Sequence, residues 1–350
     1  MTTHTTDNPC GLEGIAFIAW ADDTADKLDT LFASFGFSRT MRLRRGAIDL
    51  YEQGEIAFLL NTDADSYAGH FRRAHGPSIY AMGWKVRDAI AAFETAVGRG
   101  ARPYKPGEDP VCPLGMPAIY GIGDSLIFFV DDHSCEGGDW RSLFGPHPNP
   151  ARVSDKGFVL IDHLTNNVEK GTLGVWQDFY KDIFGFTEVR HFDIRGEETG
   201  LFSYALRSPD GSFCIPINEG TEEKSQIEEY LREYNGPGIQ HIALLTADLL
   251  ASLRMMEGSA VRFLDIDDEY YGEVFDRVPD VTEDHAEIQR LQVLVDGDDD
   301  GYLLQIFTQN VVGPIFFELI QRKNHLSFGE GNFGALFRSI ERDQQRRGVL

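Results

Sequence analysis

The chain has 350 residues, of which 42% are hydrophobic, and it carries a formal net charge of −24. This length predicts two domains of about 150 residues each. The negative charge repels nucleic-acid phosphates and anionic lipid, so we expect neither nucleic acid nor a membrane as a partner.

Export and membrane insertion are not expected either. No apolar run approaches the roughly 18 residues of a membrane helix, and residues 1–7 lack the basic and apolar character of a leader. The cysteines, Cys10, Cys112, Cys135 and Cys214, are widely spaced without a Cys-x-x-Cys pair. This spacing argues against a disulfide framework and a thiolate zinc site. We expect a soluble, cytoplasmic protein with reduced thiols.

The first predicted elements form a helix, strand, strand and helix in turn. Residues 29–37 have an amphipathic helical pattern that ends at Gly36, and a strand follows. A Gly-Pro element at 75–82 then opens an apolar strand, and residues 86–97 are expected to form the second helix. This order predicts βαβββ-like units.

A Pro-rich stretch divides the chain. Residues 144–152 contain three prolines at alternate positions, and we interpret them as a linker. The predicted domains are 1–150 and 151–350.

The second half repeats the pattern of the first. Residues 177–186 match the first helix and its glycine, residues 235–242 match the Gly-Pro element, and residues 247–256 match the second helix. The repeat is asymmetric, because His241 stands where the first copy has Ala81. A duplicated scaffold with one working metal site is the resulting hypothesis.

Three predicted strands of the second half contain candidate metal ligands. His163 lies near the end of the apolar run 158–164, and His241 lies in a strand with an apolar face. Glu318 lies inside the almost wholly apolar run 315–322, where an unpaired carboxylate would cost several kcal/mol. Arg322 is the alternative partner, but four residues along a strand span about 13 Å. Glu318 therefore needs another cation.

The spacing of these residues favours one shared site. One ligand in each of three distant strands lets a curved sheet bring two histidines and a carboxylate to one face of a metal, as non-haem iron(II) oxygenases require. Protons should compete with the metal below about pH 6. Phe17, Ala81 and Val130 lie at or near the equivalent positions of the first half and cannot bind a metal.

Two further elements are predicted near the C-terminus. The acidic run 296–301 lies between alternating apolar runs and lacks the closing glutamate of a calcium loop, so we interpret it as a solvated hairpin turn. Phe333, Leu336, Phe337 and Ile340 are spaced as one apolar face of a helix.

The stretches 162–163, 238–241 and 317–322, together with 328–333 and 346–350, resemble the bacterial 4-hydroxyphenylpyruvate dioxygenase family. The likeness covers nearly the whole chain and is tightest from residue 155 onward. It implies an α+β fold of the vicinal oxygen chelate superfamily, in which tandem βαβββ modules form two half-open barrel domains. Residues 1–150 would be a degenerate, metal-free structural domain, and residues 151–350 would be the catalytic domain with a C-terminal lid helix.

The resemblance also implies chemistry. Fe(II) bound by His163, His241 and Glu318 would act with O2 on 4-hydroxyphenylpyruvate, giving homogentisate and CO2 in the catabolism of tyrosine and phenylalanine. Polar residues would orient the substrate, and apolar residues would complete its pocket. The polar set is Ser203, Asn218, Gln226, Gln240 and Gln305, and the apolar set is Pro216, Phe307, Phe328 and Phe333.

Alternatives remain for the residues and for the function. Ser203 and Gln226 have a surface or capping role as their alternative, and the phenylalanines have ordinary core packing. 4-Hydroxymandelate synthase is the alternative activity, although residues 216–218 and Phe333 agree with the dioxygenase pattern. A metal-free binding protein on the same scaffold is the alternative from another class. We expect a homo-oligomer, but the sequence is silent on the number of subunits.

Overall fold

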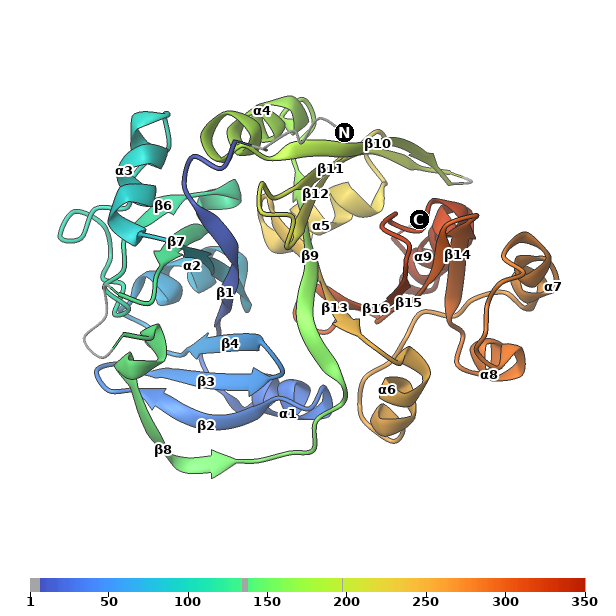
Figure 1. Ribbon diagram of the computed structural model, residues 1–350, viewed down its shortest axis with the longest axis horizontal. Helices are drawn as coiled ribbons and strands as arrows, with labels where there is room; N and C mark the ends of the chain where they lie inside the picture. The colour runs from blue at the N-terminus through green and yellow to red at the C-terminus, as the bar shows by residue number, and fades with distance from the viewer. Residues whose placement is uncertain (1–6, 134–137, 197, 350) are drawn as a thin grey trace.

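A computed structural model describes residues 7–133, 138–196 and 198–349. The chain forms two eight-stranded sheets with helices around them, one sheet from each half of the sequence (Figure 1). The α+β fold of two half-barrel domains is confirmed. Within the described ranges, no helix is long and apolar enough to cross a membrane.

The described residues of the first half form eight strands and three α-helices, with 3₁₀ turns at Ile122–Asp124 and Trp140–Leu143. In chain order these are β1 (Leu12–Ala21), α1 (Asp26–Ser34), β2 (Ser38–Leu43), β3 (Ile48–Gln53), β4 (Ile56–Asn61), α2 (Tyr67–His75), β5 (Ser78–Val86), α3 (Ala89–Gly98), β6 (Ala118–Tyr120), β7 (Leu126–Val130) and β8 (Phe144–Ala151).

The second half repeats this order with insertions near its end. Its elements are β9 (Phe158–Val168), α4 (Leu173–Asp178), a π-helical turn (Phe179–Ile183), β10 (Thr187–Arg195), β11 (Gly200–Arg207), β12 (Cys214–Gly220), α5 (Gln226–Tyr234), β13 (Gly238–Thr246), α6 (Leu249–Met256), α7 (Asp268–Arg277), α8 (His285–Arg290), β14 (Leu294–Asp298), β15 (Gly301–Phe307), β16 (Phe316–Lys323), a 3₁₀ turn (Glu330–Asn332) and α9 (Phe333–Arg347).

The two sheets share one topology over seven strands, and the additional strand, β8 in the first sheet and β14 in the second, lies at opposite ends of the shared order. The strand orders are β6-β7-β5-β1-β4-β3-β2-β8 and, read from the opposite edge, β14-β15-β16-β13-β9-β12-β11-β10. In each half the first strand pairs antiparallel with the strand after the Gly-Pro element, and that strand pairs parallel with β7 or β16. The predicted hairpin at 296–301 is confirmed by the antiparallel pair β14 and β15.

Strand register corrects one predicted equivalence between the halves. Ala243 pairs with both His163 and Glu318, whereas its counterpart Gly83 pairs with Phe17 and Phe128. Phe128, and not Val130, therefore stands in the place of Glu318. The ring of Phe17 lies 6.0 Å from that of Phe128 and 5.2 Å from that of Trp140, so aromatic side chains fill this position in the first half.

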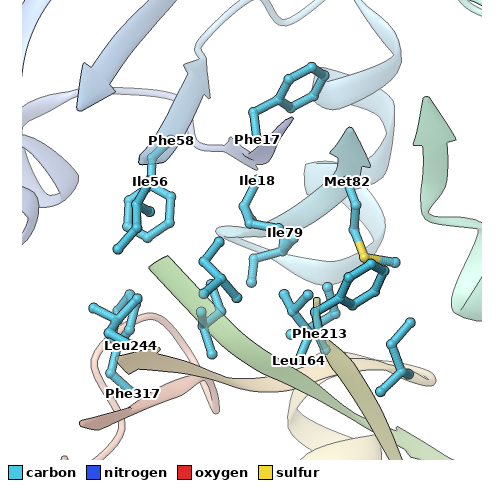
Figure 2. Packing of buried hydrophobic residues seen from close by; sticks show 14 of the residues in the cluster. Phe17, Ile18, Ile56, Phe58, Ile79, Met82, Leu164, Phe213, Leu244 and Phe317 are labelled. Carbon is cyan, nitrogen blue, oxygen red and sulfur yellow. The ribbon is translucent and has the colours of Figure 1, made fainter. Parts of the chain in front are cut away.

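The two sheets bury a common core between them (Figure 2). The ring of Phe317 on β16 lies 4.7 Å from Phe35 and 6.0 Å from Trp20, both of the first half. Because side chains alternate along a strand, Phe317 on one face leaves Glu318 on the other. A carboxylate can therefore lie within an apolar sequence without entering this core.

The predicted linker is wrong. Residues 144–151 form strand β8, which pairs with β2 at the edge of the first sheet. Alternate residues of a strand direct their N–H groups to the same side. Prolines at alternate positions, Pro146, Pro148 and Pro150, thus suit an edge strand, in which one row of N–H groups has no partner strand.

Candidate metal centre and active-site cavity

Three adjacent strands bring the predicted metal ligands together. His163 on β9 and Glu318 on β16 both pair with Ala243 of the central strand β13, and His241 lies two residues before Ala243. The Glu318 carboxylate oxygen Oε2 lies 3.1 Å from Nε2 of His163 and 3.5 Å from Nε2 of His241. All three side chains are buried.

This group of atoms fits a metal ion. One ligand atom from each residue lies within 4.8 Å of the others. Metal bonds of about 2.1 Å set at right angles would separate neighbouring ligand atoms by about 3 Å. Two imidazoles and one carboxylate on one side of an ion also match the donor set of non-haem iron(II) sites. His163, His241 and Glu318 can therefore hold a metal.

A β-bulge precedes each histidine and places a polar side chain against its ring. The register on β9 skips Asp162, and the register on β13 skips Gln240. Such an extra residue bends its strand and redirects side chains. Nδ1 of His163 donates to Asp162 at 2.8 Å, and Nδ1 of His241 donates to Gln240 at 3.2 Å. Both Nε2 atoms are thereby directed toward Glu318.

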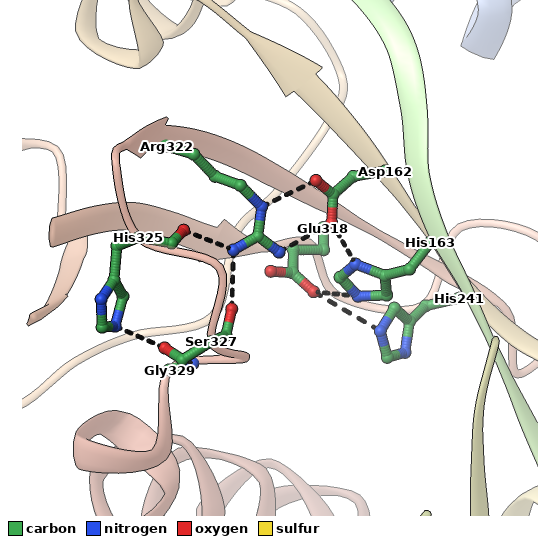
Figure 3. A network of polar contacts seen from close by, with 8 residues as sticks. All are labelled: Asp162, His163, His241, Glu318, Arg322, His325, Ser327 and Gly329. Carbon is green, nitrogen blue, oxygen red and sulfur yellow. Dashed lines mark hydrogen bonds and ion pairs between the residues drawn. The ribbon is translucent and has the colours of Figure 1, made fainter. Parts of the chain in front are cut away.

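Arg322 supports the first of these contacts (Figure 3). Its guanidinium donates to both carboxylate oxygens of Asp162, at 2.7 and 2.8 Å. It also donates to the backbone carbonyls of His325 and Ser327, at 3.0 and 2.6 Å. The sequence suggested Arg322 only as an alternative partner for Glu318, and its pair with Asp162 was not predicted.

Burial and mutual attraction compete in setting the pKa values of the three ligands. Burial lowers the pKa of His163, but the charge of Glu318 and the hydrogen bond to Asp162 raise it to about 9. Burial raises the pKa of Glu318, but the two histidines lower it to about 2. Burial lowers the pKa of His241. Without a metal, His163 therefore carries a proton and Glu318 is ionised.

The three candidate ligands line a cavity between the second sheet and α9. The space among its lining atoms, including the part open to solvent, is about 650 Å³. All of the predicted site residues line it: His163, Ser203, Pro216, Asn218, Gln226, Gln240, His241, Gln305, Phe307, Glu318, Phe328 and Phe333.

Ser203 and Gln226 do not have the surface or capping role that was their alternative. Ser203 is buried and pairs in register with Asn218, so it does not lie on the outer surface. Gln226 is the first residue of α5, but the cap of that helix is Ser225, whose hydroxyl accepts a hydrogen bond from Glu228 N–H. Gln226 faces the cavity instead.

Several lining residues were missed by the sequence analysis. Phe192 packs edge-on against Phe333, with ring centroids 5.1 Å apart, and Phe316 stacks on His241 at 4.7 Å. Thr165, Ile194, Leu201 and Ala205 line the same space. The alternation of Phe192 and Ile194 along β10 was the available signal. Phe316 gave none, because its sequence neighbours are equally apolar.

The C-terminal helix covers the cavity with its predicted apolar face. Phe333, Leu336, Phe337 and Ile340 of α9 all line the cavity. On the flank of the helix, buried Glu341 accepts hydrogen bonds from the backbone N–H and the hydroxyl of Thr199, each at 3.1 Å. The helix is thus anchored to the β10–β11 turn.

Comparison with known proteins agrees with this geometry. A family model described as the N-terminal part of hydroxyphenylpyruvate dioxygenase matches residues 6–144, and a model of the glyoxalase, bleomycin resistance protein and dioxygenase superfamily matches residues 160–306. A 4-hydroxyphenylpyruvate dioxygenase of Legionella pneumophila is 45% identical, over 98% of both chains. The chain belongs to the 4-hydroxyphenylpyruvate dioxygenase family.

Two further proteins are similar to this chain over nearly its whole length. Protein MelA of Shewanella colwelliana is 56% identical, over 98% of this chain and 99% of that protein. A solved fusion of a xylose isomerase-like TIM barrel with a 4-hydroxyphenylpyruvate dioxygenase superposes with a TM-score of 0.80 at 27% identity. The match covers 96% of this chain and 54% of the fusion protein.

The described cysteines are reduced, as the sequence predicted. Cys10, Cys112 and Cys214 are free thiols. Cys135 lies outside the described residues.

Proposed function

We propose that the chain is an Fe(II)-dependent 4-hydroxyphenylpyruvate dioxygenase that converts its substrate and O2 to homogentisate and CO2. The observation that carries this proposal is the convergence of His163, His241 and Glu318 in the wall of a largely apolar cavity, in a chain of this family. These three residues would hold the iron. Bound Fe(II) supplies a Lewis-acid and redox centre at which an α-keto acid and O2 can react.

The remaining residues of the cavity hold the substrate and exclude water. Phe192 of β10 contacts Phe328 and Phe333, and the rings of all three line the cavity and can pack on the faces and edges of a phenyl group. Ser203 and Asn218 lie side by side and offer a hydroxyl and an amide to the polar ends of the substrate. Burial of the reacting groups limits competition from water.

We infer a division of labour between the halves of the chain. Residues 1–150 would be a structural domain without a metal, since Phe17, Ala81 and Phe128 offer no ligand at the equivalent positions. Residues 151–350 would be the catalytic domain, closed by α9. We further infer that the protein acts as a homo-oligomer in the cytoplasm, in the catabolism of tyrosine and phenylalanine.

Anaerobic reconstitution tests the activity. The metal-free protein is loaded with Fe(II), mixed with 4-hydroxyphenylpyruvate and O2, and the products are identified by chromatography. We expect one iron per chain and homogentisate as the product. Hydroxymandelate instead would show the synthase activity, and a protein that binds no iron and consumes no O2 would be a binding protein.

A Phe333→Ile variant should alter the product. Phe333 lines the cavity and is braced by Phe192, so a smaller side chain would leave space beside the substrate. Since about 1.4 kcal/mol changes a product ratio tenfold, we expect some hydroxymandelate beside homogentisate. Chromatography of products from wild type and variant decides the point. An unchanged single product at an unchanged rate would show that Phe333 does not steer the reaction.

Iron binding should release a proton from His163 at pH values up to about 9. A histidine with an ordinary pKa would release one only at lower pH. His163 has its pKa raised to about 9, so it is protonated below that pH and must lose the proton to bind a metal. Apparent iron affinity should therefore rise about tenfold per pH unit up to about 9. Anaerobic calorimetry in buffers of different ionisation enthalpy measures the protons released, and a value near zero at pH 7.5 would contradict the prediction.

A further inference from the structure

A buried asparagine lies behind one polar residue of the cavity. Asn332, at the start of α9, is completely buried. Its side-chain oxygen Oδ1 accepts hydrogen bonds from the hydroxyl of Tyr270 at 2.7 Å and from Nη2 of Arg277 at 3.2 Å. Its nitrogen Nδ2 donates to Oε1 of Gln305 at 3.4 Å. Asn332 thus connects α7 to the wall of the cavity.

The orientation of the Asn332 amide follows from its partners. Arginine can only donate hydrogen bonds, so the amide atom facing Arg277 must be the oxygen. The hydroxyl of Tyr270 accepts a hydrogen bond from the backbone N–H of Val295 at 2.7 Å, and its one proton has two acceptors, Oδ1 of Asn332 at 2.7 Å and the Val295 carbonyl at 2.9 Å. Arg277 therefore turns Oδ1 toward α7 and Nδ2 toward Gln305.

The orientation of Gln305 follows in turn. Its Oε1 accepts from Asn332, so its NH2 group at Nε2 is the end available to the cavity that Gln305 lines. Gln305 pairs with Ile320, two residues from Glu318 on the same face of the sheet. A Cβ at Gly329, where φ is +78°, would lie 2.0 Å from Oε1 of Gln305. This glycine gives the amide oxygen room on the side away from the substrate.

We propose that Asn332 is a positioning residue that fixes the Gln305 amide with its NH2 group directed into the cavity. This inference rests on the proposed function. An α-keto acid presents carboxylate, keto and phenol oxygens, which need hydrogen-bond donors. With the amide reversed, the Gln305 oxygen would face those oxygens. The hydrogen bonds that link Arg277 to Asn332 and Asn332 to Gln305 therefore favour a substrate whose oxygens accept hydrogen bonds.

An Asn332→Asp variant tests the orientation with almost no change in shape. The new carboxylate can still accept from Arg277, and its charge is compensated there. It can only accept from Gln305, however, so the Gln305 amide should turn and direct Oε1 into the cavity. We expect the anaerobic Kd of 4-hydroxyphenylpyruvate for the Fe(II)-loaded enzyme, measured by calorimetry, to rise roughly 10- to 100-fold.

A double variant separates positioning from a general structural effect. Gln305→Leu removes the donor outright and should weaken binding by a similar factor. In that background, Asn332→Asp should change the Kd by less than about twofold, because both substitutions remove the same hydrogen bond. Fully additive effects would overturn the proposal and leave Asn332 a structural residue.

Hydrogen exchange of the Gln305 side chain gives a readout without substrate or iron. In protein labelled with ¹⁵N-glutamine, the Gln305 NH2 signal is identified by its loss in Gln305→Leu. It should exchange with water quickly in wild type and at least about tenfold more slowly in Asn332→Asp, where it is bonded to the carboxylate. Equal rates would overturn the proposal. Slowed exchange in a protein that does not bind 4-hydroxyphenylpyruvate would support the positioning role and refute the proposed function.

Discussion

Replacing Glu318 by Gln should remove most of the iron affinity and nearly all oxygen consumption. The substitution keeps the shape of the side chain but removes the only negative charge among the three ligands. Loss of a group that only orients a metal ligand typically lowers metal affinity about 10- to 100-fold, so loss of the charged ligand itself should lower iron affinity at least about a hundredfold. Anaerobic iron titration and an oxygen electrode measure the two effects.

A second glutamate of the same domain provides the matched control. Glu283 accepts hydrogen bonds from Lys323 and Gln321 at 2.7 Å each and does not line the cavity. Glu283→Gln is the same chemical change at a largely buried carboxylate, and it should leave iron affinity and oxygen consumption close to wild type. Full activity in Glu318→Gln would refute the assignment of this ligand.

The sequence predicted the ligands because each of them breaks an apolar pattern. Glu318 is a charge in an apolar strand, and His241 differs from Ala81 at the same place in a repeat. These signals are local, and the fold needed only to bring three strands together. The neighbours that orient the ligands gave weaker signals. Asp162 and Gln240 act through β-bulges, and a bulge depends on pairing with a distant strand.

Errors in the predicted fold have a similar origin. The prolines of β8 were interpreted as a linker because only the edge position of the strand, set by its pairing with β2, makes them acceptable. Val130 was placed at or near the position equivalent to Glu318, two residues from Phe128, because β7 contains no charged residue to fix its register. In both cases the missing information was strand pairing, which residue types alone do not specify.

Arg322 joins the metal ligands to the loop that carries the aromatic wall. Its guanidinium is bonded on one side to Asp162, which orients His163, and on the other to the carbonyls of His325 and Ser327 (Figure 3). The side chains of Arg322 and Asp162 are only 13% and 14% exposed. The buried Arg322 guanidinium therefore fixes the position of Asp162, and through it the candidate ligand His163, relative to the segment before Phe328.

Arg322→Met should destabilise the protein and weaken iron binding. The methionine fills much of the volume but leaves the Asp162 carboxylate buried and without its cation. We expect the free energy of unfolding to fall by about 3–5 kcal/mol, as for other broken buried pairs. Iron affinity should fall about 10- to 100-fold, the usual cost of losing a group that orients a metal ligand. Urea unfolding of the metal-free protein and anaerobic iron titration measure these quantities.

Two further variants identify the cause of the loss. Arg254→Met breaks an ion pair with Glu287 in which the arginine side chain is 45% exposed, and it should cost no more than about 1 kcal/mol. In Asp162→Asn with Arg322→Met, the uncompensated charge is gone and the new amide oxygen can still accept from Nδ1 of His163. Most of the stability and part of the iron affinity should then return. If the double variant is as unstable as Arg322→Met alone, the bonds to the loop carbonyls, and not the charge pair, are what Arg322 contributes to stability.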